Sequence, residues 1–516
     1  MRNIILLFLL PLVPALLHAQ HTNVKISSFD YPEEPTICIN PKNPQQVVAG
    51  SNIDHVFYSE DGGLTWQRDQ MASTYGVWGD PCIIADTSGA FYFFHLSNPP
   101  QGNWIDRIVC QRMDTLKGSW TTGSYMGLNG TKAQDKEWVV VDPQNNHLYS
   151  TWTQFDNYGS ADPADSSVIL FSKSTDRGDT WSPAVRINTV AGDCIDSDNT
   201  VEGAVPAVGP NGQVYVAWTG PEGIMFDRSL DGGATWLATD IPVSAQPGGW
   251  DYSIPGIYRC NGLPVTCCDL SNTPTRGNIY VNWTDQRNGA TDTDVWFVKS
   301  TDDGTTWTQP QRVNDDPAGK QQFFTWMTID QVTGWIYVVY YDRRNYADEQ
   351  TDVFMAVSKD GGNSFFNFRI SESPFVPVSS VFFGDYNNIS AHNNVVRPMW
   401  TRLHNGELSV WTAIIDMNWL GVNTPEPAPF NIDPVYPNPF EQSAWFKFKL
   451  HEPSRVSLRV SDIHGKTITT LYNNALLPSG KYLEHFTPGQ KLSPGIYLFR
   501  FECNGKVVTR KIVYQP

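Results

Sequence analysis

Basic residues are scarce in this chain of 516 residues, in which 36 Lys and Arg stand against 53 Asp and Glu and the net charge is −17. Nucleic-acid backbones are bound by patches of Lys and Arg, and no such patch is visible here. The composition therefore argues against a nucleic-acid partner. An acidic ligand would need a local basic pocket within a generally negative surface.

Long apolar runs are also missing, except at the N-terminus. Residues 1–19, "MRNIILLFLLPLVPALLHA", combine one positive charge with a short apolar core, which is typical of a secretory signal peptide cut near Ala19. The alternative, a membrane anchor, is disfavoured because the run is short. We therefore expect export, with no integral membrane segment in the mature chain, to the medium or the outer cell surface.

Patterns for zinc binding are absent, because the eight cysteines form no CxxC pair and the histidines do not cluster. An exported chain meets an oxidising compartment. Cys260, Cys267 and Cys268 lie close in sequence and Cys194 is a further candidate partner, but spacing does not give connectivity. We expect small buried side chains together with one or two disulfides.

Charged residues are few, at 17%, whereas Gly (40), Pro (36) and Trp (19) are plentiful. This mixture favours an all-β protein with many turns. The length favours at least two domains.

One short pattern, Ser-x-Asp-x-Gly-x-Thr-Trp, recurs five times along the chain. The copies are "SEDGGLTW" at Ser59, "STDRGDTW" at Ser174, "SLDGGATW" at Ser229, "STDDGTTW" at Ser300 and "SKDGGNSF" at Ser358. The last four therefore lie 55, 71 and 58 residues apart. A decayed copy, "QRMDTLKGSW", falls in the long first gap at 111–120.

Each copy belongs to a larger unit of four predicted strands. Two apolar runs joined by a turn precede the box, as in "AVPAVGPNGQVYVAW" (204–218), one strand leads into the box and another leaves it. A final unit without a box runs from "FFGDYNNIS" to "ELSVWTAII" and brings the count to seven. Seven units predict a β-propeller over 20–416, with six blades as the alternative. The N-terminal "VKISSFD" resembles a fourth strand, so we expect it to complete the last blade and close the ring.

These boxes are similar to the Asp-box, or BNR, repeats of the sialidase-like propellers, a resemblance that covers roughly 24–416. It implies that the box is the hairpin between the third and fourth strands, on the face opposite the ligand site, and therefore structural. Its Asp accepts N–H bonds in the turn and its Gly takes a positive φ. The box aspartates are Asp61, Asp176, Asp231, Asp302 and Asp360.

A Pro-rich linker at 417–432 separates this array from a second region at 433–516. The later region contains "YPNPF", "DIHGK" and "LSPGIY" followed by a strand that ends in Lys. It resembles the type A C-terminal sorting domain of the bacterial type IX secretion system. The resemblance implies a small β-sandwich, contact with that secretion machinery, and release or surface attachment.

Acidic and aromatic residues recur in the loops that enter the first strand of several units, where the propeller would place them around its channel. Carboxylates with aromatic platforms suit sugar rings, or a Ca²⁺ ion. The predicted ligand-binding residues are Trp78, Glu137, Trp138, Trp250, Trp326 and Asp385, and the predicted Ca²⁺ ligands are Glu34, Asp80, Glu202 and Asp385. The alternative is that the acids cap loops or pair with local cations.

The sialidase resemblance also implies a catalytic set, of which only part can be found. Tyr386 stands near the position of the nucleophilic tyrosine, Glu202 near its assisting glutamate, and Asp80 is placed as the acid by position alone. The family's Arg-Ile-Pro motif is missing, and "YPEEPTI" in its place would repel a sialic acid carboxylate. Arg287 and Arg344 recur at equivalent positions, which favours salt bridges within blades.

Two hypotheses follow for function. The first is an exported propeller that binds an extracellular glycan or glycoprotein on its loop face without catalysis. The second is a carbohydrate-active enzyme, either a divergent sialidase or another glycoside hydrolase or lyase. Convergence of Tyr386, Glu202 and at least two arginines in one pocket would favour the enzyme, because propellers host both functions.

Overall fold

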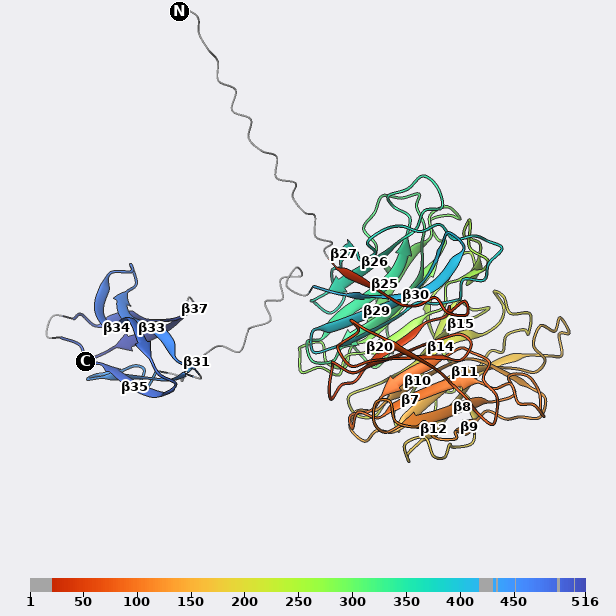
Figure 1. The fold of residues 1–516 in the computed structure, drawn as a ribbon, viewed down its shortest axis with the longest axis horizontal. Coiled ribbons are helices and arrows are strands. Elements are labelled where there is room, and N and C mark those ends of the chain that lie inside the picture. The colour runs from red at the N-terminus through yellow and green to blue at the C-terminus, as the bar shows by residue number, and fades with distance from the viewer. Residues whose placement is uncertain (1–20, 417–429, 433–434, 451, 490–491, 505) are drawn as a thin grey trace, which may run out of the picture. The chain divides into compact units, whose positions relative to one another are not determined.

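The computed structural model describes residues 21–416, 430–432, 435–450, 452–489, 492–504 and 506–516. These residues form strands and turns, and they include no helix that could cross a membrane. The chain divides into two compact units, Met1–Trp419 and Leu420–Pro516 (Figure 1). The predicted signal peptide lies outside the described residues, as does most of the predicted linker.

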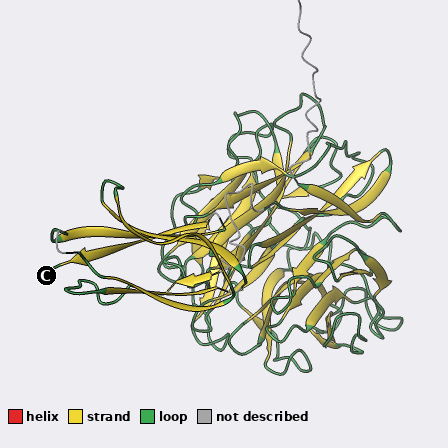
Figure 2. Ribbon diagram, turned by 60° about the vertical axis from the view of Figure 1, so that its left-hand side comes forward, coloured by secondary structure: helices red, strands yellow, loops and turns green. Residues whose placement is uncertain are grey.

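The described part of the first unit contains seven four-stranded antiparallel sheets, shown as yellow arrows in Figure 2. In six of them, four consecutive strands pair in sequence order, whereas the seventh borrows its outer strand from the N-terminus. The sheets are β2–β5 (Thr36–Ile39, Val47–Ser51, His55–Ser59, Gln67–Gln70), β6–β9 (Cys82–Ala85, Phe91–Leu96, Ile108–Met113, Ser124–Met126), β10–β13 (Ala133–Val141, Leu148–Phe155, Ser167–Ser174, Val185–Arg186), β14–β17 (Glu202–Val208, Val214–Thr219, Ile224–Ser229, Ile241–Ser244), β20–β23 (Val265–Cys268, Ile279–Asp285, Asp294–Ser300, Gln311–Arg312), β24–β27 (Gln322–Asp330, Trp335–Asp342, Asp352–Ser358, Phe366–Arg369), and β28, β29, β30 and β1 (Asn388–His392, Val395–His404, Glu407–Ile414, Thr22–Ser27).

The first strands of these sheets form a closed ring of contacts. The cycle runs β2, β6, β10, β14, β20, β24, β28 and back to β2. Strand β1 pairs with β30 from Thr22 opposite Ile414 to Ser27 opposite Val410. The unit is a β-propeller, and the prediction that the N-terminal strand completes the last sheet is confirmed.

Neighbouring sheets pack face to face through apolar side chains. All six side chains of β7 are buried, and so are all seven of β26. Strands that are covered on both faces need near-continuous apolar sequence, which is why the inner strands of the repeat are so rich in Val, Ile, Tyr and Phe.

The five boxes make the same local hydrogen bonds. In the third copy the Asp231 carboxylate accepts from the Thr235 N–H at 2.8 Å and from the Ser229 hydroxyl at 2.7 Å, and that hydroxyl accepts from the Gly233 N–H at 2.8 Å. The box glycine has φ +82°, and a Cβ added to it would lie 2.3 Å from the Phe171 ring of the preceding sheet. The glycine is therefore required both by the backbone conformation of the turn and by the close packing of the box against the preceding sheet. Equivalent bonds hold Asp61, Asp176, Asp302 and Asp360.

The predicted disulfides are wrong, because all eight cysteines are free. Cys267 and Cys268 are consecutive residues of β20, so their side chains point to opposite faces of the sheet. Cys260 is buried in a separate short hairpin. Most of the thiols are buried, as expected of small apolar side chains.

The second unit consists of two facing sheets. One is β31 (Phe430–Ile432), β32 (Ala444–Leu450) and β35 (Gly480–Phe486); the other is β34 (Thr467–Leu477), β33 (Ser454–Asp462), β36 (Gly495–Cys503) and β37 (Lys506–Tyr514). Side chains of β32 alternate between buried and exposed. The Phe446 and Phe499 rings stack at 5.2 Å in the shared core. The predicted β-sandwich is confirmed, and it includes 430–432 from the end of the predicted linker.

Candidate functional site

The inner strands of the propeller share an unusual backbone feature at their heads. Five of them have a residue with positive φ, either two residues before the strand or at a register shift within its first residues. These residues are Glu34 (φ 52°), Asp80 (φ 49°), Lys136 (φ 54°), Gly203 (φ 75°) and Phe324 (φ 50°). Four of the five are not glycine, and such strained residues persist only where the surrounding structure holds them, often at functional sites.

Lys136 is the centre of this region. Its ammonium lies 2.9 Å from Asp385 Oδ2 and 3.5 Å from Asp80 Oδ2, and all three side chains are almost fully buried. Tyr386 points its hydroxyl at Asp80 Oδ1, 3.4 Å away. The lysine therefore joins the heads of β6, β10 and β28 across the ring.

A second cation reaches Asp385 from a hairpin inserted between two sheets. Strands β18 (Asp251–Tyr252) and β19 (Cys260–Asn261) form this insert, which accounts for the long 71-residue spacing between two boxes. Arg259 donates from Nε to Asp385 Oδ1 at 2.8 Å and from Nη1 to Asp196 Oδ2 at 3.2 Å. The hairpin thus completes the charge balance of the buried carboxylate.

Ionisation states in this network diverge. Burial alone would raise the pKa of Asp385, but Lys136 and Arg259 more than offset it and lower that pKa. The pKa of Asp80 is likewise lowered, against its burial, mainly by Lys136. Burial, and then the charge of Asp80, raises the pKa of Glu34 well above its ordinary value. The two cations are therefore matched by two ionised aspartates.

Burial raises the pKa of the remaining carboxyl groups around the network. Burial is the largest cause of the raised pKa of Glu137 and Glu202, whose carboxyl oxygens have no hydrogen-bond partner among the described residues. The pKa values of Glu33 and Asp135 are raised for the same reason. A buried carboxylate without a partner would be costly, so burial favours the protonated form of these groups.

The residues do not fit the predicted Ca²⁺ ion. No group of three or more His, Cys, Asp or Glu side chains is arranged to hold a metal within the described ranges. Asp80 and Asp385 already pair with Lys136, whose ammonium occupies the place that a bridging cation would need. Asp80 and Asp385 are thus paired with the protein's own cations, which is the alternative that the sequence left open, although the sequence did not single out Lys136.

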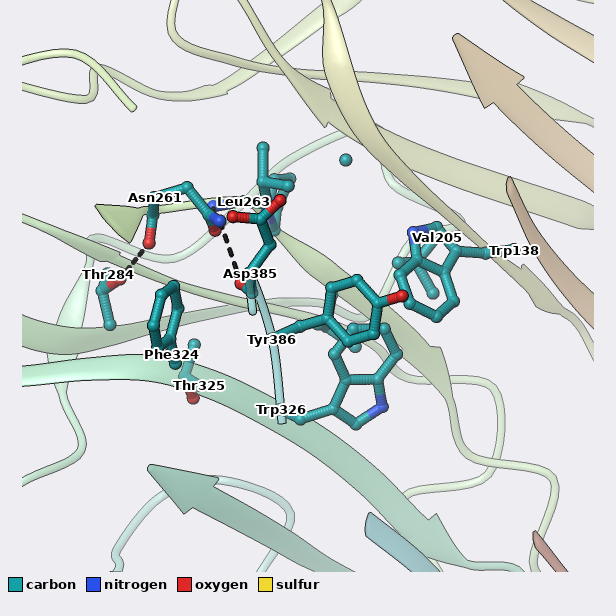
Figure 3. Close-up of a pocket in the computed structure, with 13 residues that line it drawn as sticks. Trp138, Val205, Asn261, Leu263, Thr284, Phe324, Thr325, Trp326, Asp385 and Tyr386 are labelled. Atoms are coloured by element: carbon teal, nitrogen blue, oxygen red, sulfur yellow. Dashed lines mark hydrogen bonds between the residues drawn. The ribbon is translucent and has the colours of Figure 1, made fainter. Parts of the chain in front are cut away.

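Three aromatic rings close the channel beneath this network. The Trp138 ring lies 4.5 Å from that of Trp326 and 4.9 Å from that of Tyr386. Figure 3 shows Tyr386 beside both indoles, and the small cavity next to these rings has a volume of about 10 Å³. That volume is close to the space of a single water, so these residues are a plug and not an open sugar platform.

Exposed aromatics lie above the plug. Trp78 and Trp104 are 40% and 43% exposed, with ring centroids 6.0 Å apart. Tyr158 packs 5.4 Å from Trp104 and donates to Asp196 Oδ2 at 2.6 Å. Because Arg259 binds the same Asp196 oxygen, these rings connect directly to the ion network. Trp250, in contrast, is buried and donates to the Thr200 carbonyl at 3.1 Å.

The predicted catalytic residues are near one another only in part. Tyr386 contacts Asp80 and is 6% exposed, whereas Glu202 does not line the cavity that Tyr386 lines. Arg287 pairs with Asp285, and Arg344 donates to Asp342 at 2.8 Å, so both recurrent arginines make the predicted salt bridges within their sheets.

The comparisons concern the two units separately. The model of the secretion system C-terminal sorting domain matches residues 434–515. This region is a sorting domain. It indicates type IX secretion to the cell surface or the extracellular space, in agreement with the sequence motifs. Among curated proteins, none matches the chain.

Solved structures of low sequence identity resemble the chain. They include a Hadza microbial sialidase (14% identity, 73% of this chain and 75% of that chain, TM-score 0.41). A Penicillium chrysogenum α-L-arabinanase complexed with arabinobiose is 13% identical, with 76% of this chain and 98% of that chain covered and a TM-score of 0.41. An α-L-arabinofuranosidase from Fusarium graminearum is 11% identical, with 78% of this chain and 99% of that chain covered and a TM-score of 0.44.

Proposed function

We propose that the exported propeller binds an extracellular glycan or glycoprotein on the face where the inner strands begin. The observation that carries this proposal is the unbroken series of contacts from two exposed indoles, Trp78 and Trp104, through Tyr158 and Asp196 to Arg259. Sugars offer C–H faces that stack on such rings and hydroxyl groups that bind fixed polar groups.

The charge balance of the network supports a ligand of low charge at the centre. Lys136 and Arg259 are matched by Asp80 and Asp385, so no cation is left for a ligand carboxylate. Arg259 still has a 40% exposed side chain, and its guanidinium lies over the Phe382 ring. Neutral hydroxyl groups can share hydrogen bonds with this arginine without breaking the pairs.

A glycan array with the mature chain tests this function. Trp104→Ala should weaken the best array ligand about tenfold, about 1.4 kcal/mol, because it removes an exposed stacking surface. Trp445→Ala is the matched control, since Trp445 is similarly exposed (42%) but lies in the sorting domain. Equal loss in both variants, or no array ligand at all, would contradict the proposal.

A glycosidase remains a second candidate because one observation favours it. The pKa of Asp80 is lowered and that of nearby Glu34 is raised, and carboxyl groups with divergent pKa values are typical of acid–base pairs. Both side chains are almost fully buried, however, at 7% and 2% exposure. Hydrolysis of any array ligand that Asp80→Asn abolishes would favour the enzyme over the binding module.

A further inference from the structure

A different arginine, Arg343, is buried without an ion pair among the described residues. It follows β25 and is 3% exposed. Its Nε donates to Thr351 Oγ1 at 3.0 Å, and its Nη1 donates to the Pro255 carbonyl at 2.8 Å and to Gln321 Oε1 at 3.3 Å. Its guanidinium lies over the Phe323 ring, 5.2 Å from the centroid. Its Nη2 has no hydrogen-bond partner, and no carboxylate forms an ion pair with it, among the described residues. Burial lowers the pKa of this guanidinium to about 10.

The preceding sheet shows that the fold does not need a charge at this position. Gln286 is the residue equivalent to Arg343. It directly precedes Arg287, as Arg343 directly precedes Arg344, and these two following arginines make equivalent salt bridges. The Gln286 amide donates to the Thr293 hydroxyl at 3.2 Å and to the Ser253 carbonyl of the same inserted hairpin at 3.4 Å. A neutral side chain thus makes bonds equivalent to those from Arg343 to Thr351 and Pro255, so the charge of Arg343 is not needed for these bonds.

Arg343 lies in the wall of an open pocket of about 540 Å³. Lys320 lines the same pocket, with its ammonium held by the Tyr346 carbonyl. The exposed carboxylates of Asp348 and Glu349 line it too, but neither pairs with a cation of the pocket in the described part of the chain. The site therefore offers two cationic donors together with two acceptors for hydroxyl groups.

We propose that this pocket binds an acidic sugar residue, with Arg343 and Lys320 holding its carboxylate or sulfate ester and Asp348 and Glu349 accepting from its hydroxyl groups. Arginine suits such anions because its guanidinium makes charge-assisted hydrogen bonds, and here Nη2 is the nitrogen without a partner among the described residues. The inserted hairpin contributes Pro255 to this pocket and Arg259 to the central network. The inference deepens the proposed function, on which it rests, by adding an anionic unit to the recognised glycan.

The test is titration of the mature chain with D-glucuronate, glucose 6-sulfate and glucose, followed by ligand-observed NMR. We expect either acidic sugar, but not glucose, to bind the wild type, and Arg343→Gln to weaken that binding at least tenfold. Gln is the residue of the preceding sheet, so this variant should fold. Arg343→Lys, which keeps the charge but not the fork, should bind with intermediate affinity. Lys25→Gln is the control of equal charge change, because Lys25 pairs with Glu407 on the surface.

Equal binding of glucose and the acidic sugars, or equal affinity in Arg343→Gln and wild type, would overturn the inference. A response to glucuronate alone identifies the carboxylate, and one to glucose 6-sulfate alone identifies the sulfate ester. If array glycans bind through Trp104 while Arg343→Gln does not change the binding of acidic sugars, only the inference about this pocket is wrong. If acidic sugars bind through Arg343 while the array shows nothing, the proposed function fails and the pocket stands.

Discussion

The ammonium of Lys136 lies 2.9 Å from Asp385 Oδ2, although 249 residues separate the two in sequence. The first belongs to the head of β10 and the second immediately precedes the last sheet, so the pair spans the ring. Buried ion pairs are weak sources of stability, but removing one member leaves an uncompensated charge. The pair is therefore best understood as fixing how the strand heads meet.

Replacement of the lysine should reveal that role. We expect Lys136→Met to lower the free energy of unfolding by about 3–5 kcal/mol, because Asp385 and Asp80 lose a buried partner. Lys132→Met removes a partly exposed lysine that pairs with Asp156, and should cost below about 1 kcal/mol. Urea denaturation measures both, and similar losses would show that the buried pair has no special role.

Stability should fall as the pH rises from mildly acid to mildly alkaline values. The pKa values of Glu137 and Glu202 are raised above 4.5 in the folded protein, so folding retains protons that the unfolded chain has released. Each such group can lower the free energy of unfolding by up to about 1.4 kcal/mol for each pH unit above 4.5, until the group itself ionises in the folded protein. Glu202→Gln should flatten the dependence between pH 5 and 8, measured by denaturation. The surface variant Glu407→Gln should leave it unchanged.

The repeat made the fold predictable, because each box marks the same hairpin. Asp231 and Gly233 could be assigned their turn roles from sequence, since the bonds and the positive φ are local. The pairing of β1 with β30 was also predictable, because "VKIS" has the pattern of a missing fourth strand.

The centre of the site was less predictable, because it depends on which strand heads meet. Lys136 adjoins Glu137 in sequence, yet only the ring places its ammonium against Asp385. Arg259 lies in an insert whose sole signal was a long spacing between boxes. The plug of Trp138, Trp326 and Tyr386 looked like a sugar platform because aromatic residues at equivalent loops do not reveal their burial.

The box glycine should be more critical than the box aspartate. Asp231→Ala removes turn bonds and should cost about 1–2 kcal/mol without selective loss of binding. Gly233→Ala adds a Cβ that would clash with Phe171, so we expect a larger loss. Gly159 has a similar φ of +76° with nothing within 4 Å, and Gly159→Ala isolates the backbone term. Thermal unfolding measures the stability of all three variants. Equal losses of stability in Gly233→Ala and Gly159→Ala would contradict the claim that Gly233 is needed for close packing against Phe171.

Ring closure should depend on the mature N-terminus. Deleting residues up to Phe29 removes β1 and exposes the edge of β30. We expect aggregation or a large fall in the melting temperature, detected by light scattering and calorimetry. A truncated protein that melts like its parent would show that β1 is dispensable.

Sialic acid should not be released from a fluorogenic sialoside. Sialidases hold the substrate carboxylate with three arginines. Among the described residues, Arg259 is the arginine that reaches the central network, and it is committed to Asp385 and Asp196. The sequence resemblance leads us to expect "YPEEPTI", with its two glutamates, where sialidases have their first arginine, and Tyr386 is buried in the plug. The assay uses the mature chain with Tyr386→Phe and Glu202→Gln as controls. Hydrolysis that disappears in both variants would contradict the non-sialidase interpretation, because it would show that the tyrosine and the glutamate act together in catalysis.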